Sequence, residues 1–152
     1  MMIRKYKTTD CEEIAQLFYE TVHSVNARDY SSEQRNAWVT GSVDMQVWNH
    51  SFLKHYTMVA VDDERIVGFG DIDRTGYLDH LFIHKDYQGK GVASVLCNEL
   101  EMYAFKNGAS VLSTHTSITA KPFFQRRGYE MMKEQQVERN GVKLTNFVMK
   151  KV

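Results

Sequence analysis

Two glycines that flank a lysine mark a place where the backbone itself could do chemistry. Gly89, Lys90 and Gly91 follow an apolar run and precede a segment of helical periodicity. Glycine accepts a positive φ and carries no Cβ, so successive N–H groups from Gln88 to Ser94 can point into one concavity at a helix start. A helix start offers unsatisfied N–H donors and the positive end of the helix dipole. The turn therefore predicts an anion site, which suits a pyrophosphate, with added charge from Lys90.

Two common nucleotide-binding motifs do not fit this turn. The lysine of a P-loop is followed by Ser or Thr, whereas Gly91 follows Lys90. A dinucleotide fingerprint needs a third glycine where Ser94 stands, and the strand before this turn is late in the chain. The bare glycine pattern also fits a tight strand-to-helix turn with no ligand, and at this point that alternative stays open.

Hydrophobic periodicity and turn signals predict the elements that position the turn. Capping boxes at Thr9 with Glu12 and at Ser31 with Gln34 predict two helix starts, and Gly41 predicts a break before a third helix. The expected helices span 8–25, a short stretch from 31, 42–54, 91–106 and 118–127. The expected strands span 2–7, 56–61, 65–72, 77–84, 110–117, 129–138 and 142–152, and the last two are joined by an Asn-Gly turn.

This order of elements predicts an α/β, or α+β, fold. We expect one mixed, mostly antiparallel sheet of six to seven strands, flanked by four to five helices and containing one strand-helix-strand crossover. The 152 residues fit a single domain over 1–152.

Composition excludes several classes of function. Nineteen basic residues balance nineteen acidic ones, so the sequence shows no net positive charge that would attract nucleic acid or an anionic membrane. The two cysteines, Cys11 and Cys97, form no CxxC motif, which indicates neither a disulfide framework nor a zinc site. No signal peptide or apolar span is recognisable. We expect a cytoplasmic protein without a metal, a nucleic-acid partner or a membrane partner.

The sequence resembles the GCN5-related N-acetyltransferase (GNAT) family. Gln88-Gly89-Lys90-Gly91-Val92-Ala93 matches the family pattern Gln/Arg-x-x-Gly-x-Gly/Ala, after the strand LDHLFIHKDY and before an amphipathic helix. Downstream, ITAKPFFQRRGY is similar to the family element Ala-x-x-x-Tyr-x-x-x-Gly-Phe, with Ala120, Gly128 and Tyr129 in register. The expected order of strands and helices fits the family along the whole chain.

The resemblance implies that the chain binds acetyl-CoA, as co-substrate, and transfers the acetyl group to an amine. The main-chain amides of Gln88, Gly89, Lys90, Gly91, Val92, Ala93 and Ser94 would then hold the pyrophosphate. Leu81, Phe82 and Ile83 would pair with the pantetheine arm, and the N–H of Phe82 or Leu81 would polarise the thioester carbonyl as an oxyanion site.

An alkylammonium is protonated at neutral pH, so the reaction needs a base. The resemblance places such a base near Asp79, directly or through water, and His80 is the alternative. Strand alternation predicts that Asp79, Leu81 and Ile83 lie on one face of the sheet and His80 on the other.

Two departures from the family pattern concern the acid that protonates the leaving thiolate. The resemblance counts Phe124 among the cofactor-binding residues, but Phe124 stands where the family often has tyrosine, and it has no hydroxyl. Ser117 stands where the family often has asparagine. Because an alkyl thiol has a pKa of about 8.5, the thiolate can leave with little protonation. Ser117, Thr119 or a water could supply the proton. Cys97 is expected to be a core thiol, so we expect direct transfer in a ternary complex.

The acceptor is not specified by the sequence. The resemblance implies that early helices and the late hairpin form the acceptor side, which puts Tyr30 and Trp38 forward as substrate contacts. A small-molecule or peptide amine is expected, and a homodimer is compatible with an exposed terminal hairpin. The alternative reading is a non-catalytic CoA-binding sensor or regulatory protein on the same fold, for which Phe124 is the best support.

Overall fold

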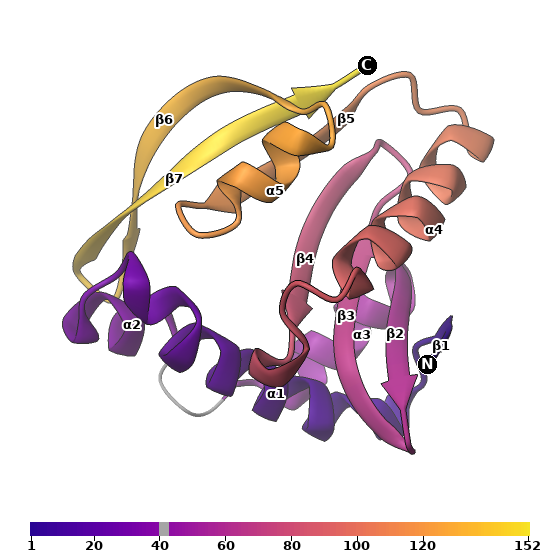
Figure 1. Ribbon diagram of the computed structural model, residues 1–152, viewed down its shortest axis with the longest axis horizontal. Coiled ribbons are helices and arrows are strands. Elements are labelled where there is room, and N and C mark those ends of the chain that lie inside the picture. Colours follow the sequence, from indigo (N-terminus) through magenta and orange to yellow (C-terminus); the bar gives the residue numbers. More distant parts are fainter. Residues whose placement is uncertain (40–42) are drawn as a thin grey trace.

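One sheet organises the chain, with strands in the order β1-β2-β3-β4-β5-β7-β6 (Figure 1). The computed structural model describes residues 1–39 and 43–152. Within these ranges the strands are β1 Met2–Lys5, β2 Tyr56–Asp62, β3 Arg65–Ile72, β4 Tyr77–Ile83, β5 Leu112–Ser117, β6 Glu130–Arg139 and β7 Val142–Lys151. β4 and β5 run parallel, whereas their neighbours pair antiparallel. The predicted mixed, mostly antiparallel sheet is confirmed.

Five α-helices accompany the sheet in the described ranges, as predicted. They are α1 Cys11–Ser24, α2 Ser32–Trp38, α3 Met45–Lys54, α4 Val92–Lys106 and α5 Lys121–Arg126. The capping box of α2 is confirmed, because Gln34 N–H donates to Ser31 Oγ and Ser31 N–H donates to the Gln34 side chain. The predicted break at Gly41 and helix start at Ser42 lie outside the described residues.

The predicted capping box at Thr9 and Glu12 is wrong. Thr9 lies in a short 3-10 turn, Thr8–Asp10, and α1 begins only at Cys11. The reason is Asp10, whose carboxylate accepts hydrogen bonds from the Arg4 guanidinium and from the Lys7 N–H. These bonds fix the turn before the helix, so the start of α1 shifts past Thr9.

Helices cover both faces of the first four strands. α4 packs on one face, where Val92, Leu96 and Leu100 join a buried core with residues of β2, β3 and β4. α1 and α3 supply the second core, to which Phe18 belongs and in which Phe52 packs against Phe69 of β3. No helix in residues 1–39 or 43–152 is long and apolar enough to cross a membrane.

Beyond β4 the sheet divides. β5 pairs with β4 at Tyr77–Ser113 and Leu78–Thr114, and its other side pairs with β7 over its whole length. β7 lies between β5 and β6, and this hairpin curves away from the first four strands in Figure 1. On the edge of β4 that faces β5, the residues after Leu78 therefore border an opening rather than a neighbouring strand.

Candidate active site

The glycine turn forms the concavity that the sequence predicts. Gly89 and Gly91 have φ values of +72° and +83°, and Gly91 is the N-cap residue of α4. A Cβ on either glycine would meet nothing within 4 Å, so the space above the turn is open. The first N–H groups of α4 face that space without side-chain caps. The turn therefore fits an anionic group such as a pyrophosphate.

The opening between β4 and β5 exposes main-chain donors of β4. His84 N–H donates to Val67 O of β3, and hydrogen-bonded pairs alternate along an antiparallel ladder. Phe82 therefore pairs its N–H with β3, whereas the N–H of Leu81 points toward the opening. Of the two donors proposed for the oxyanion, the register favours Leu81 and excludes Phe82.

One cleft of about 970 Å³ brings most of the predicted residues together. It is lined by Tyr30, Trp38, Asp79, His80, Leu81, Phe82, Ile83, Gln88, Gly89, Gly91, Val92, Ala93, Ser94, Ser117 and Phe124. Lys90 does not line it; its ammonium lies 5.3 Å from the centre of the Tyr87 ring. The cleft thus joins the glycine turn, the β4–β5 opening and the aromatic side chains of α1 and α2.

A buried carboxylate that the sequence reading missed lies beside this cleft. Asp71 of β3 is 0% exposed, and each of its oxygens contacts one imidazole: His55 Nδ1 at 2.8 Å and His80 Nδ1 at 2.9 Å. Burial raises the pKa of Asp71, but the two hydrogen bonds outweigh it and the pKa is lowered overall. The signal was a single acid within the apolar run RIVGFGDI, because a buried charge requires partners.

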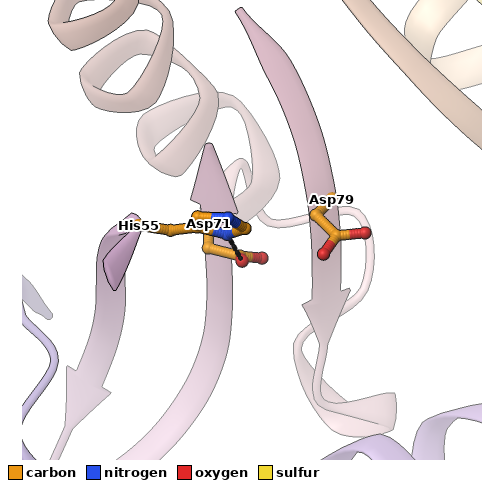
Figure 2. A group of neighbouring side chains, drawn as sticks. All are labelled: His55, Asp71 and Asp79. Atoms are coloured by element: carbon orange, nitrogen blue, oxygen red, sulfur yellow. Dashed lines mark hydrogen bonds and ion pairs between the residues drawn. The ribbon is translucent and has the colours of Figure 1, made fainter. Parts of the chain in front are cut away.

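Asp79 lies at a β-bulge, which makes the predicted alternation of faces wrong. Asp71 pairs with His80 and Ile72 pairs with Leu78, so Asp79 is an extra residue with no opposite partner. Its carboxylate is 34% exposed and lies 3.6 Å from His80 Nδ1 rather than on the opposite face. Figure 2 shows Asp79 on β4 beside the Asp71–His55 pair, and one carboxylate oxygen of Asp79 lies within 4.8 Å of ligand atoms of both residues.

Ser117, which the sequence suggests as a proton donor to the leaving thiolate, lies in the cleft with its hydroxyl. Ser117 Oγ accepts a hydrogen bond from Ala120 N–H at 3.1 Å, and its own proton is donated to no acceptor among residues 1–39 and 43–152. Phe124 is 2% exposed and packs edge-on against Phe123 and Tyr129. The Tyr129 hydroxyl is directed away from this role, since it donates to the buried Glu101.

The two residues predicted to contact the acceptor, Trp38 and Tyr30, lie in different surroundings. Trp38 is half-buried and packs near Phe18, Tyr30 and Phe82. The Tyr30 hydroxyl is already used: it donates to Thr145 O at 2.6 Å and accepts from Ile118 N–H at 2.9 Å. Tyr30 therefore ties the start of α2 to β7 and to the end of β5, and only its ring can contact a substrate.

Comparisons with known proteins agree with this architecture. Residues 26–151 match the family described as acetyltransferase (GNAT) domain. An uncharacterized N-acetyltransferase of Escherichia coli K12, YafP, is 35% identical over 99% of this chain and 95% of its own. The chain belongs to the GNAT family of acyltransferases.

Solved structures extend the comparison to three dimensions. A GCN5-related N-acetyltransferase from Rhodopseudomonas palustris superposes with a TM-score of 0.94 at 31% identity, covering 99% of this chain and 94% of that one. The PaiA N-acetyltransferase of Thermoplasma acidophilum, solved in complex with coenzyme A, has a TM-score of 0.80 at 18% identity over 99% and 97% of the two chains. At that identity the second likeness shows the fold alone.

Proposed function

We propose that this acyltransferase moves an acetyl group from acetyl-CoA to an amine by direct attack in a ternary complex. The observation that carries the proposal is the continuity of one cleft from the open glycine turn, through the β4–β5 opening, to the aromatic acceptor side. A pyrophosphate at the turn would place a pantetheine arm along β4 and a thioester at Leu81. The coenzyme A in the Thermoplasma acidophilum relative supports this choice of co-substrate.

The cofactor side is assigned to main-chain groups. The amides of Gln88 to Ser94 would bind the pyrophosphate, where the dipole of α4 adds favourable charge. The side chain of Gln88 donates to Ile83 O at 2.7 Å, which holds the turn against the end of β4. The N–H of Leu81 would bind the thioester oxygen, whose negative charge grows in the transition state.

The reaction consumes an ammonium and a thioester and yields an amide, a thiol and a proton. A base on β4, Asp79 or His80, first removes one proton from the ammonium. The nitrogen lone pair then attacks the carbonyl carbon, the C–S bond breaks, and its electrons leave on sulfur. The attacking nitrogen loses a second proton, and the thiolate gains one from Ser117 or from water.

An acyl-enzyme on Cys97 is disfavoured by its surroundings. The thiol is fully buried within α4, and burial raises its pKa to about 12. A thiol that stays protonated is a poor nucleophile. Direct transfer to the amine needs no such intermediate.

Calorimetric titration with acetyl-CoA tests the cofactor assignment first. We expect micromolar binding that depends on the pyrophosphate, so adenosine alone, as the control ligand, should bind far more weakly. An amine panel with colorimetric detection of released thiol then tests transfer. Tight binding without thiol release on any amine would favour the non-catalytic CoA sensor, and equal binding of adenosine would refute the pyrophosphate site.

A further inference from the structure

The mechanism above assigns no role to Asp71, although burial of its charge is unfavourable in free energy. A carboxylate that is 0% exposed loses its hydration, and such a charge persists only when other groups compensate it. Here the compensation comes from two imidazoles, one of which, His80, lines the cleft while the other, His55, does not. The carboxylate therefore connects the cleft to a fixed, buried charge.

The contact between Asp71 and His80 decides which nitrogen of His80 carries the proton. An ionised carboxylate only accepts hydrogen bonds, so Nδ1, at 2.9 Å from Asp71 Oδ1, must be the donor. In the neutral ring the lone pair then lies on Nε2. Within the described part of the chain Nε2 makes no hydrogen bond, and the side chain is 23% exposed in the cleft.

The rest of the surroundings holds the imidazole in place. Trp48 and Phe52 of α3 lie with ring centres 5.5 Å from it, and Phe18 of α1 meets it edge-on at 6.4 Å. Phe69 and Phe82 complete this aromatic wall. The titratable groups that face His80 in the described residues are Asp71 of β3, Asp79 of β4 and, through Asp71, His55 at the end of α3.

We propose that His80 is the general base of the acetyl transfer and that Asp71 is its positioning residue, which fixes the Nδ1–H tautomer and directs the Nε2 lone pair into the cleft. This assignment rests on the proposed function. His80 Nε2 takes the proton of the substrate ammonium, the ring becomes an imidazolium, and Asp71 stabilises that cation. Asp79 acts as a neighbouring charge rather than as the base.

The titration of His80 fits this role. Burial lowers its pKa, but the hydrogen bond to Asp71 and the charges of Asp71 and Asp79 outweigh burial, so the pKa is raised above 6.5. A base whose pKa lies near the working pH is in large part unprotonated and still binds a proton strongly enough to take it from the substrate. Since the neutral ring is the active form, the rate should rise as pH increases through this raised pKa and then level off.

Side-chain nitrogen NMR tests the tautomer without any knowledge of the acceptor. Long-range ¹H–¹⁵N spectra of the six histidines, with His80 assigned from His80→Gln, should show a protonated Nδ1 and a bare Nε2. His55→Gln is the matched control, because it replaces the other imidazole that contacts the same carboxylate and should leave this tautomer unchanged. In Asp71→Asn the new amide can donate to Nδ1, so the tautomer should switch to Nε2–H.

Kinetics on the best amine of the panel test the base. His80→Gln and Asp71→Asn should each lower kcat by about 10²- to 10⁴-fold, the usual contribution of a general base, with calorimetric acetyl-CoA affinity kept within about threefold. The ascending pH limb should disappear in His80→Gln. In Asp79→Asn it should remain and move to lower pH, since one neighbouring negative charge is gone. His50→Gln, an exposed change on α3, serves as the neutral control.

Several results would overturn the assignment. An Nε2–H tautomer in the wild type would do so whatever the turnover, and so would a wild-type rate and pH limb in Asp71→Asn. Loss of the limb in Asp79→Asn but not in His80→Gln would make Asp79 the base. If Asp71→Asn does not fold, His80→Ala with added imidazole decides: restored turnover supports the base, and no recovery contradicts it. Binding of acetyl-CoA with no acetylated amine refutes the proposed function and the base role with it.

Discussion

The hydroxyl of Thr114 donates a hydrogen bond to the main-chain carbonyl of Leu78 at 2.9 Å, at the second of the two residue pairs that join β5 to β4. Beyond that pair the edge of β4 that faces β5 borders the cleft. The buried side chain of Thr114 thus supports the point at which the sheet divides, and the shape of the cleft at this point depends on the contact.

Thr114→Val should leave the Leu78 carbonyl short of a buried donor. We expect a loss of about 1–3 kcal/mol in the free energy of unfolding, together with weaker acetyl-CoA binding. Thr116→Val, two residues along the same strand, is the matched control, because the Thr116 hydroxyl makes only a long contact of 3.4 Å. Urea unfolding and calorimetry measure both, and equal effects of the two substitutions would contradict a special role for Thr114.

Gly91→Trp should abolish acetyl-CoA binding, because an indole at this position fills the space above the turn. Gly108→Trp is the control at the other end of α4: its φ of +96° imposes the same backbone penalty, and its Cβ also meets open space. We expect similar thermal unfolding temperatures for the two variants and cofactor binding only in the Gly108 variant. An unchanged affinity in the Gly91 variant would refute the cradle.

Tyr30→Phe should destabilise the acceptor side of the cleft, since the hydroxyl serves both Ile118 N–H and Thr145 O. Losing both bonds should lower the free energy of unfolding by about 1–3 kcal/mol and raise KM for the amine more than KM for acetyl-CoA. Tyr19→Phe, at an exposed tyrosine of α1, is the control. A purely kinetic effect with unchanged stability would instead indicate that the Tyr30 hydroxyl contacts the substrate.

Glu101→Gln should lower stability in a pH-dependent way. Burial raises the pKa of Glu101, but hydrogen bonds from Arg127 and Tyr129 lower it below 4.5 overall. The charged form therefore stabilises the fold above pH 4.5, and this contribution is lost as the pH falls through the lowered pKa. The variant should be about 2 kcal/mol less stable at pH 7, and the difference should shrink below about pH 4. A constant difference across this range would show that the carboxylate charge is not responsible.

Phe124→Tyr should fold and change kcat by no more than a few-fold at neutral pH. The leaving thiol has an ordinary pKa of about 8.5, so its thiolate departs without much help from an acid. Stopped-flow detection of thiol release measures the effect, with Phe123→Tyr as the neighbouring control. A large rise in rate specific to position 124 would show that protonation of the thiolate limits the wild-type reaction.

Local sequence rules predicted the elements and the glycine turn well, because each depends on neighbours in the chain. The positive φ of Gly89 and Gly91 follows from their residue type and their place between a strand and a helix. The predicted start of α1 was wrong for a nonlocal reason. Arg4 of β1 binds Asp10, and no rule for helix starts includes that contact.

The catalytic side could be predicted only in part. Period-two alternation assumes an unbroken strand, and the bulge at Asp79 breaks it, which brings two side chains together that the rule separates. Asp71 was missed because its partners come from distant positions: His55 precedes β2 and His80 lies on β4. A lone acid in an apolar strand indicates a buried charge, but local sequence patterns do not identify the residues that neutralise Asp71.

The place of β7 in the sheet has a consequence for the order in which the protein matures on the ribosome. Its residues, Val142–Lys151, follow every other described element in the sequence, yet they pair with β5 on one side and β6 on the other. Since β5 shares two residue pairs with β4, it has little to hold it until β7 emerges. The first four strands with α4 can assemble earlier, as N-terminal parts of a nascent chain generally do. The wall of the cleft that carries Ser117 can therefore be completed only after β7 has emerged and paired with β5.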